Sequence, residues 1–309
     1  MSRPARHSPA VVRDVAADAL GVRIDDASHI AAGYGNENWR VTTADGERFI
    51  AKIGPAASAS KWAATGGAQE LARQIGVPTP QLIHFDPSCD ALGGSVMRMF
   101  EWIDGVPGPA AVARHPERLL GDLGRAAAML HGQHVDRFTS RLDGSAPTFD
   151  RWDEYVAYRS EQIVERSSGA GAFDAAYLDR FATTIVSAAA AVADHACAVV
   201  CHRDLHLDNV IAREDGSLLA LLDFDMAEGW DAPVDLVRLR LHVFPEHPAA
   251  EAAFIAGYRE VRVDDQAWDE RLWIVEMLEL VNAAANAVLL ADRAYEGLVR
   301  RRLAAIDRH

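Results

Sequence analysis

The chain has 309 residues, of which 50% are hydrophobic and 25% are charged, as in folded globular proteins of one or two domains. Its formal net charge of -14 argues against a broad phosphate-binding surface and so against nucleic acid as a partner. No apolar run is long enough to span a bilayer and no signal segment opens the sequence, so we expect a cytoplasmic protein without a membrane partner. The spacing of Cys89, Cys197 and Cys201 does not suggest a zinc site.

The first hundred residues predict a small antiparallel sheet that carries one helix. Residues 28–53 form a pattern of strand, glycine-containing turn, strand, Asp-Gly turn and strand. A helix is expected over 58–75 and is ended by Gly76 and Pro78, after which LIHF and GSVMRMFEWI predict two more strands. The first ten residues are expected to be a loose tail.

After the Pro/Gly-rich stretch DGVPGP the pattern becomes mainly helical. The segments RLLGDLGRAAAMLHGQH and YLDRFATTIVSAAAAVADHA carry apolar residues at helical spacing. The short runs AVVCH, VIARE and LLALLDF predict strands, and from about residue 233 the chain is again helical. The sequence therefore predicts an α+β protein with an N-terminal unit over 1–103 and a larger, mainly helical unit over 104–309.

The segment 201–215, CHRDLHLDNVIARED, concentrates charged residues directly after a predicted buried strand. Asn209 lies in this segment, and fourteen residues later Asp223 ends the apolar run LLALLDFD. A carboxylate at the end of a buried strand is costly unless a cation meets it. Mg²⁺ prefers oxygen ligands and takes only one or two carboxylates from a protein. Asn209 and Asp223 are therefore the candidate metal ligands.

Asp204 and Lys52 complete the chemistry that phosphoryl transfer needs. Asp204 can accept a proton from a substrate hydroxyl, while the reaction otherwise requires positioning and neutralisation of phosphate charge. Lys52 and Lys61 are the only lysines in the chain, and Lys52 lies in the predicted strand RFIAKI. We expect Lys52 to bind nucleotide phosphates and Glu70, in the next helix, to pair with it.

Together these motifs resemble the aminoglycoside phosphotransferase family of small-molecule kinases, over residues 33 to 240. The resemblance implies a two-lobed protein-kinase-like fold, with a small nucleotide-binding N-lobe over 1–103 and a larger catalytic and substrate-binding C-lobe over 104–309. It implies ATP or GTP and Mg²⁺ as cofactors, Asp204 as the catalytic residue, and Asp235 as a structural prop of the catalytic loop. The implied nucleotide-binding residues are Lys52, Glu70, Gly33, Gly35, Met99, Phe100, Glu101 and Trp102.

The catalytic loop departs from the family pattern at Arg203, where the family usually has glycine. In protein kinases an arginine there grips a phosphorylated activation segment. Asp235 follows Asp223 within twelve residues, which leaves little room for such a segment, so we expect Arg203 to pair with a local carboxylate. His202 is interpreted either as a ligand or as a brace for the loop.

The acceptor site is less determined by the sequence. Glu276, Glu279, Asn282 and Asn286 recur at helical spacing, and their stripe either faces solvent or lines the cleft, where acidic residues would receive amino groups. Residues 152 to 155, which include Asp153, lie where the family places helices that contact substrate. Asp225 is also a candidate for a second contact to the metal ion. His206 is interpreted either as a contact to substrate or metal or as a solvated loop position. The remaining candidate substrate contacts are Asp208, Asp225 and Glu228.

The sequence thus predicts a phosphotransferase that transfers the γ-phosphoryl group to a hydroxyl of a small, cationic, amine-bearing molecule. An aminoglycoside-type antibiotic, with a role in antibiotic resistance, or a related natural product is the first interpretation. A metabolic kinase for an amino sugar or amino alcohol, a protein Ser/Thr kinase and a catalytically silent nucleotide-binding module are the alternatives. Both a monomer and a homodimer are compatible with the sequence.

Overall fold

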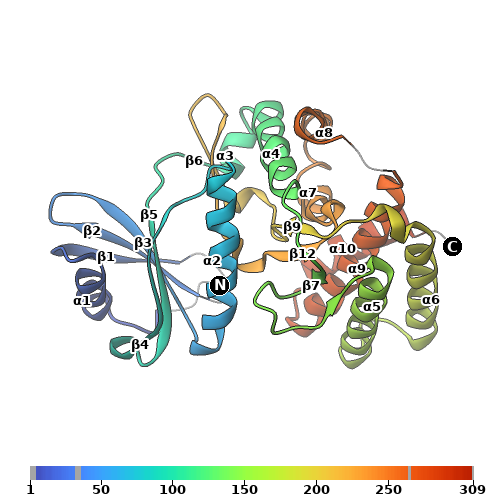
Figure 1. Cartoon of the computed structure of the whole chain (residues 1–309), viewed down its shortest axis with the longest axis horizontal. Coiled ribbons are helices and arrows are strands. Elements are labelled where there is room, and N and C mark those ends of the chain that lie inside the picture. The colour runs from blue at the N-terminus through green and yellow to red at the C-terminus, as the bar shows by residue number, and fades with distance from the viewer. Residues whose placement is uncertain (1–4, 32–35, 264–265, 308–309) are drawn as a thin grey trace.

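A computed structural model describes residues 5–31, 36–263 and 266–307. Figure 1 shows a small lobe built around a sheet and a larger lobe of helices, with α2 running along the junction between them. The sheet of the small lobe has the order β1-β2-β3-β5-β4, with every neighbouring pair antiparallel. Its strands are β1 (Ile24–Ile30), β2 (Glu37–Thr43), β3 (Arg48–Gly54), β4 (Leu82–Cys89) and β5 (Ser95–Glu101). The predicted two-lobed α+β architecture is confirmed.

The small lobe carries two helices, α1 (Pro9–Leu20) and α2 (Ala59–Gln74), although the sequence analysis expected only one. Helix α1 buries Val12 and Val15 in the same cluster as Trp39 and Val41 of β2. Its start is well marked, because Ser8 caps the helix and Pro9 occupies the first turn, where its missing N–H costs nothing. These local signals were present in the segment that we interpreted as a tail.

Two backbone contacts hold the connecting segment and the small lobe against the large lobe. β6 (Val106–Pro107) pairs with β10 (Val210–Ala212) of the large lobe, which also pairs with β11 (Leu218–Leu221). The backbone N–H of Leu221 donates to the carbonyl of Pro78, just after α2, at 2.8 Å. Gly105 must be glycine, because a Cβ there would lie 2.6 Å from the carbonyl oxygen of Ala212. The boundary after residue 103 stays a prediction.

Helices surround the strands of the large lobe. They are α3 (Gly108–Val112), α4 (Pro116–His131), α5 (Trp152–Gly169), α6 (Ala175–Val192), α7 (Leu236–His242), α8 (Pro248–Val261), α9 (Trp268–Leu289) and α10 (Arg293–Ile306). A four-stranded sheet of short strands has the order β8-β7-β12-β9. Its strands are β7 (Phe138–Thr139), β8 (Thr148–Phe149), β9 (Val199–Cys201) and β12 (Glu228–Trp230).

Helices α4 and α8 cross in backbone contact. A Cβ at Gly257 would lie 2.0 Å from the carbonyl oxygen of Gly121, and one at Gly124 would lie 2.1 Å from that of Phe254. Only glycine at these positions permits so close an approach, since a larger side chain would have to push one backbone away from the other. The crossing fixes α4, whose last residue is His131, against the large lobe.

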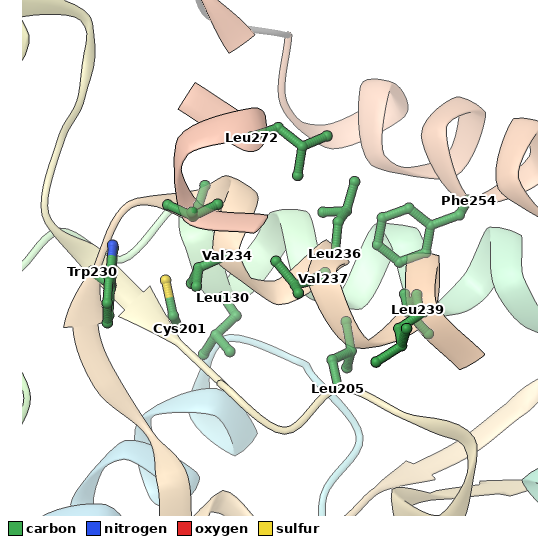
Figure 2. Close-up of a cluster of buried hydrophobic side chains, with 14 of the residues drawn as sticks. Leu130, Cys201, Leu205, Trp230, Val234, Leu236, Val237, Leu239, Phe254 and Leu272 are labelled. Carbon is green, nitrogen blue, oxygen red and sulfur yellow. The ribbon is translucent and has the colours of Figure 1, made fainter. Parts of the chain in front are cut away.

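Figure 2 shows the apolar cluster beneath the segments that follow β9 and β12. Leu205 points into it beside Leu239 of α7 and is 1% exposed, in the same core as Phe254 of α8. A buried leucine directly after Asp204 ties that part of the chain to the core.

Helix α9 has the length and hydropathy of a membrane span. However, 67% of its most apolar 18-residue stretch is buried inside the protein, as in the core helix of a globular fold. Its buried side chains pack in the same cluster as those of α5, α6 and α7.

Candidate active site

The catalytic loop follows β9 and is held by a buried carboxylate. Asp235 accepts hydrogen bonds from the backbone N–H of His202 at 2.7 Å and from that of Arg203 at 2.6 Å. The ring nitrogen Nε2 of His131 lies 3.0 Å from the same carboxylate, and its Nδ1 lies 3.0 Å from the hydroxyl of Tyr258. Burial favours the protonated form, but these partners hold the pKa of Asp235 below its ordinary value. Asp235 therefore props the loop, as the resemblance implied.

His202 braces the same loop. Its Nδ1 lies 3.3 Å from the backbone nitrogen of Asp204, and its Nε2 lies 2.9 Å from the carbonyl oxygen of Leu222. The N–H of Asp204 can only donate, which makes Nδ1 the acceptor and Nε2–H the donor. The ring is buried between the two segments, which supports the interpretation of His202 as a brace.

The side chain of Arg203 is buried in a pocket of the large lobe. Its Nε donates to Glu228 at 2.8 Å and its Nη2 donates to Glu279 at 2.9 Å. The guanidinium lies 4.3 Å from the ring centroid of Trp230, and that of Arg159 lies 4.6 Å from the same centroid. The prediction that Arg203 pairs with local carboxylates is confirmed. Its φ of 67° is left-handed, a conformation that costs a non-glycine residue roughly 1–2 kcal/mol.

Asp204 faces cations and amide donors. Its Oδ1 lies 2.9 Å from Nε of Arg238, and its Oδ2 accepts from the amide of Asn209 at 3.1 Å. His206 approaches the same oxygen, with Nε2 at 3.4 Å. Burial raises the pKa of Asp204, but His206 and Arg238 together hold it well below the ordinary value of 3.8. Asp204 is therefore ionised and able to accept a hydrogen bond from a hydroxyl group.

Lys52 of the small lobe contacts two carboxylates of the large lobe. Its Nζ lies 2.8 Å from Oδ1 of Asp223 and 2.7 Å from Oδ2 of Asp225. Burial lowers the pKa of Lys52, but the two carboxylates raise it above its ordinary value, so the side chain is a cation. Asp223 adopts a left-handed φ of 59°, as functional residues held in strained backbone often do.

Asn209 and Asp223 supply oxygen atoms suited to a metal ion. The backbone N–H of Leu222 donates to the carbonyl of Asn209 at 2.8 Å, which ties the two segments together. The side-chain Nδ2 of Asn209 donates to Asp204, so the amide oxygen points away from it. Oδ1 of Asp223 accepts from Lys52 and its Oδ2 has no partner among the described residues. One amide and one carboxylate oxygen fit Mg²⁺.

The structure corrects the role expected of Glu70. Its carboxylate accepts from Arg73 at 2.8 Å and from Gln74 at 3.0 Å, on the outer face of α2. The face of α2 that is buried carries Thr65 and Gln69 instead. Lys52 therefore pairs with Asp223 and Asp225, and not with Glu70.

The predicted nucleotide loop and hinge are placed only in part. Gly33 and Gly35 lie outside the described residues. Met99 and Phe100 lie near the end of β5, with Met99 buried in the small-lobe core. The backbone N–H groups of Glu101 and Trp102 already donate to the carbonyls of Gln81 and Arg48. Any backbone contact from this segment to adenine therefore has to use its carbonyl groups or residues beyond Trp102.

Arginines from other elements engage three members of the polar stripe of α9. Glu276 is 2% exposed and accepts from Arg302 at 2.6 Å, with Nε of Arg240 at 3.1 Å. Glu279 is held by Arg203, and Asn282 accepts from Arg166 of α5 at 3.0 Å. The solvent-facing interpretation is wrong for Glu276, because this side chain is buried against arginines. The interpretation of the stripe as a lining of the cleft stays a prediction.

Other candidate substrate contacts are also engaged within the protein. Glu228 is buried against Arg203, and Asp225 pairs with Lys52. Asp153 forms an ion pair with Arg151 at 3.0 Å, while Trp152 and Tyr155 are core residues. The side chain of Asp208 is 79% exposed on the catalytic loop and remains available for an incoming molecule.

Two arginines at the site were missed by the sequence analysis. Arg98 occupies β5 opposite Lys52 and donates to Asp225 at 3.0 Å. A lone arginine within the apolar run VMRMF was a usable signal, because a buried charge requires a partner. Arg238, beside Asp204, follows Asp235 by three residues and lies in the first turn of α7. Only the folded contact identifies it.

A buried group of three further side chains lies behind the loop. Ligand atoms of His131, Cys201 and Asp235 lie within 4.8 Å of one another, close enough to hold a metal ion. The hydrogen bonds of His131 to Asp235 and Tyr258 account for this arrangement without one.

Solved structures share this architecture along almost the whole chain. A proposed fructosamine-3-kinase from Haemophilus somnus 129PT matches with a TM-score of 0.70 at 16% identity, over 94% of this chain and 96% of that one. A thermostable mutant of aminoglycoside phosphotransferase APH(4)-Ia, in ternary complex with AMP-PNP and hygromycin B, matches with a TM-score of 0.68 at 11% identity. This match covers 96% of this chain and 97% of that one. Macrolide 2'-phosphotransferase type I matches with a TM-score of 0.63 at 14% identity, over 98% of this chain and 99% of that one. These matches define a protein-kinase-like fold.

The family follows from the sequence itself. Residues 26–274 match the model of the phosphotransferase enzyme family, APH, so the chain belongs to that family. It is a phosphotransferase whose acceptor is a hydroxyl group. No curated protein matches the sequence.

Proposed function

We propose that the protein transfers the γ-phosphoryl group of ATP to a hydroxyl group of a small, amine-bearing molecule. One observation carries this proposal: Nζ of Lys52, from the small lobe, lies 2.8 Å from the carboxylate of Asp223 in the large lobe. Asp204 and Asn209 are hydrogen-bonded to each other beside it. A cation for phosphates, oxygen ligands for a metal and a base thus meet in one cleft between the lobes.

Each side chain has a separate task in this reaction. Asp204 accepts a hydrogen bond from the acceptor hydroxyl and takes its proton, which orients the oxygen for attack. Lys52 offsets the negative charge of the nucleotide phosphates, and for this it must exchange its contact with Asp223 for one with phosphate oxygen. Asn209 and Asp223 would hold Mg²⁺. When bound, Mg²⁺ supplies positive charge against the triphosphate.

The acceptor class is supported by two observations. The structural neighbours include proteins named for fructosamine and aminoglycoside substrates, and one of them is bound to hygromycin B. The net charge of -14 favours a cationic small molecule over an anionic one. The carboxylates of α9 do not contribute to this argument, because arginines engage them. An aminoglycoside-type antibiotic and a metabolic amino sugar or amino alcohol both fit this acceptor class.

The test is a phosphoryl-transfer screen with purified protein against hydroxylated amines, aminoglycosides, macrolides and sugars, run with ATP and separately with GTP. We expect acceptor-dependent consumption of ATP that stops when EDTA removes divalent metal. Asp204→Asn should lower turnover by a factor on the order of 10² or more, because it removes the base. Asp194→Asn, an exposed aspartate outside the site, is the matched control and should leave turnover with ATP close to that of the wild type. Transfer that does not respond to Asp204→Asn would refute the assignment.

A further inference from the structure

Arg98 is a buried cation to which the sequence analysis assigned no role. It lies on β5 directly opposite Lys52 on β3, and it is 1% exposed. Two positive side chains therefore stand next to each other on the face of the sheet that meets the large lobe. Such an arrangement is stable only if carboxylates lie between them.

Arg98 is fixed by four separate contacts. Its guanidinium lies 4.9 Å from the ring centroid of Trp62 and 5.9 Å from that of Phe85. Nη2 donates to the hydroxyl of Thr65 on α2 at 3.0 Å, and Nη1 donates to Oδ1 of Asp225 at 3.0 Å. Burial lowers the pKa of Arg98 from its ordinary value and Asp225 opposes that change, yet an arginine stays charged.

Asp225 bridges the two cations. Its Oδ1 accepts from Arg98, and its Oδ2 lies 2.7 Å from Nζ of Lys52 and 3.4 Å from the amide nitrogen of Asn36. Both oxygens of this carboxylate thus face donors of the small lobe. An arrangement of this kind leaves Asp225 poorly placed as a metal ligand or a substrate contact.

Helix α2 offers no carboxylate that could perform the same task. Its buried polar residues are Thr65 and Gln69, and Gln69 donates to the carbonyl of Pro80 at 2.8 Å. Glu70 binds Arg73 on the outer face. If Asp223 turns to a metal ion, Lys52 keeps one carboxylate partner, Asp225, and Arg98 keeps that partner in place.

We propose that Asp225, anchored by Arg98, is the carboxylate that orients Lys52 toward the nucleotide phosphates. This inference rests on the proposed function, because it concerns how the phosphate lysine is held. Arg98 is then a positioning residue that acts through Asp225. The arrangement links β3, β5, α2 and the segment after Asp223 through charged groups that span both lobes.

A double-mutant cycle on nucleotide affinity tests the proposal. Asp225→Asn and Arg98→Lys are each made in the wild type and in Lys52→Met, and binding of AMP-PNP with Mg²⁺ is measured by calorimetry. We expect each change to weaken binding about tenfold when Lys52 is present and less than about twofold when it is methionine, since coupled residues are not additive. The KM for ATP should rise in the same proportion, while that for the acceptor stays unchanged.

Controls separate this role from a purely structural one. Arg48→Lys alters the first residue of β3, an arginine that pairs with Asp104, and should leave binding unchanged. Thermal unfolding of every variant identifies any that fail to fold. Asp225→Asn keeps the shape of the side chain, so it still tests the proposal if Arg98→Lys fails to fold. Equal weakening in both backgrounds would overturn the proposal and make Asp225 a direct contact of metal or nucleotide. A wild type that binds no nucleotide with Mg²⁺ would instead refute the proposed function.

Discussion

Oδ1 of Asp235 lies 2.6 Å from the backbone nitrogen of Arg203, so a fully buried carboxylate holds the residue that precedes Asp204. The other oxygen of Asp235 accepts from the backbone of His202 at 2.7 Å. The position of Asp204 is therefore set from inside the core, by a residue more than thirty positions away in the sequence.

The first prediction concerns Asp235→Asn. An amide has one acceptor oxygen, so its NH₂ group would face a backbone N–H and leave a buried donor unpaired. Hydrogen bonds to charged groups contribute about 1.5–3 kcal/mol, and we expect a loss of about 3 kcal/mol in the free energy of unfolding. Urea unfolding measures this loss, and kinetics should show a larger fall in kcat than change in the KM for ATP. Normal kcat in a correctly folded variant would contradict the role of Asp235.

The second prediction sets backbone strain against ion pairing at Arg203. Arg203→Gly relieves the left-handed conformation, roughly 1–2 kcal/mol, but leaves Glu228 and Glu279 without their partner. Removal of one partner from a buried pair costs about 3–5 kcal/mol, so the variant should be less stable despite the relieved strain. A variant as stable as the wild type in urea would show that the ion pairs contribute little.

This effect depends on pH in a definite direction. Burial raises the pKa of Glu279, but Arg203 holds it below the ordinary value of 4.5. The stabilisation is therefore present above pH 4.5 and is lost as the pH falls through the folded pKa. We expect the stability difference between the wild type and Arg203→Gly to shrink below pH 4.5. Adding Glu279→Gln to the variant should remove much of this pH dependence.

The third prediction concerns Arg238, which lies 2.9 Å from Asp204. Arg238 and His206 together lower the pKa of Asp204 against the effect of burial. Arg238→Met should raise that pKa, so the acidic limb of the kcat/KM profile should move to higher pH. Arg238→Lys keeps the charge and should keep the limb near its original place. A profile that does not move in the methionine variant would show that another group controls the limb.

The fourth prediction tests the position of α2. Because Glu70 binds Arg73 and Gln74 on the outer face, Glu70→Ala should change the KM for ATP by less than about twofold, as for most surface substitutions. Lys52→Met is the positive control and should raise it strongly. If Glu70→Ala raised the KM for ATP as much as Lys52→Met does, α2 would have to turn in the nucleotide-bound enzyme and bring Glu70 to Lys52.

The fifth prediction uses two glycines in helices. Gly257→Ala places a Cβ 2.0 Å from the carbonyl oxygen of Gly121, and neither backbone can yield cheaply, so we expect a loss of about 3 kcal/mol. Gly67→Ala in α2 meets nothing within 4 Å and should stabilise the protein by about 1 kcal/mol, because alanine favours helix. In urea, the midpoint of unfolding should fall for Gly257→Ala and rise for Gly67→Ala. A rise for both variants would contradict the close crossing of α4 and α8.

The fold and the central residues were predictable because their signals are local. Lys52 lies in a strongly patterned strand, and Asp204, Asn209 and Asp223 follow short buried strands at recognisable spacing. The structure places Lys52 against Asp223 and Asn209 against Asp204, as expected of one site. Their catalytic and metal-binding roles stay predictions.

Apart from helix α1, which begins in the segment that we interpreted as a tail, the corrections concern which residues meet across different elements. Helical spacing correctly put Glu276 and Glu279 on α9, but it carried no information about Arg302 or Arg203, which reach them from elsewhere. The spacing of α2 likewise allowed Glu70 to face the sheet, whereas the burial of Trp62 and Thr65 sets the helix in a different rotation. Burial decides such rotations, and burial depends on the tertiary packing of all the elements involved.

The pairing of β6 with β10, together with the bond from Leu221 to Pro78, has a structural consequence. The first joint anchors the connecting segment and the second anchors the small lobe just after α2, and both lead to the same pair of strands, β10 and β11. Asn209 directly precedes β10, and Asp223 follows β11 after one intervening residue. The two candidate metal ligands and both joints therefore belong to one hairpin.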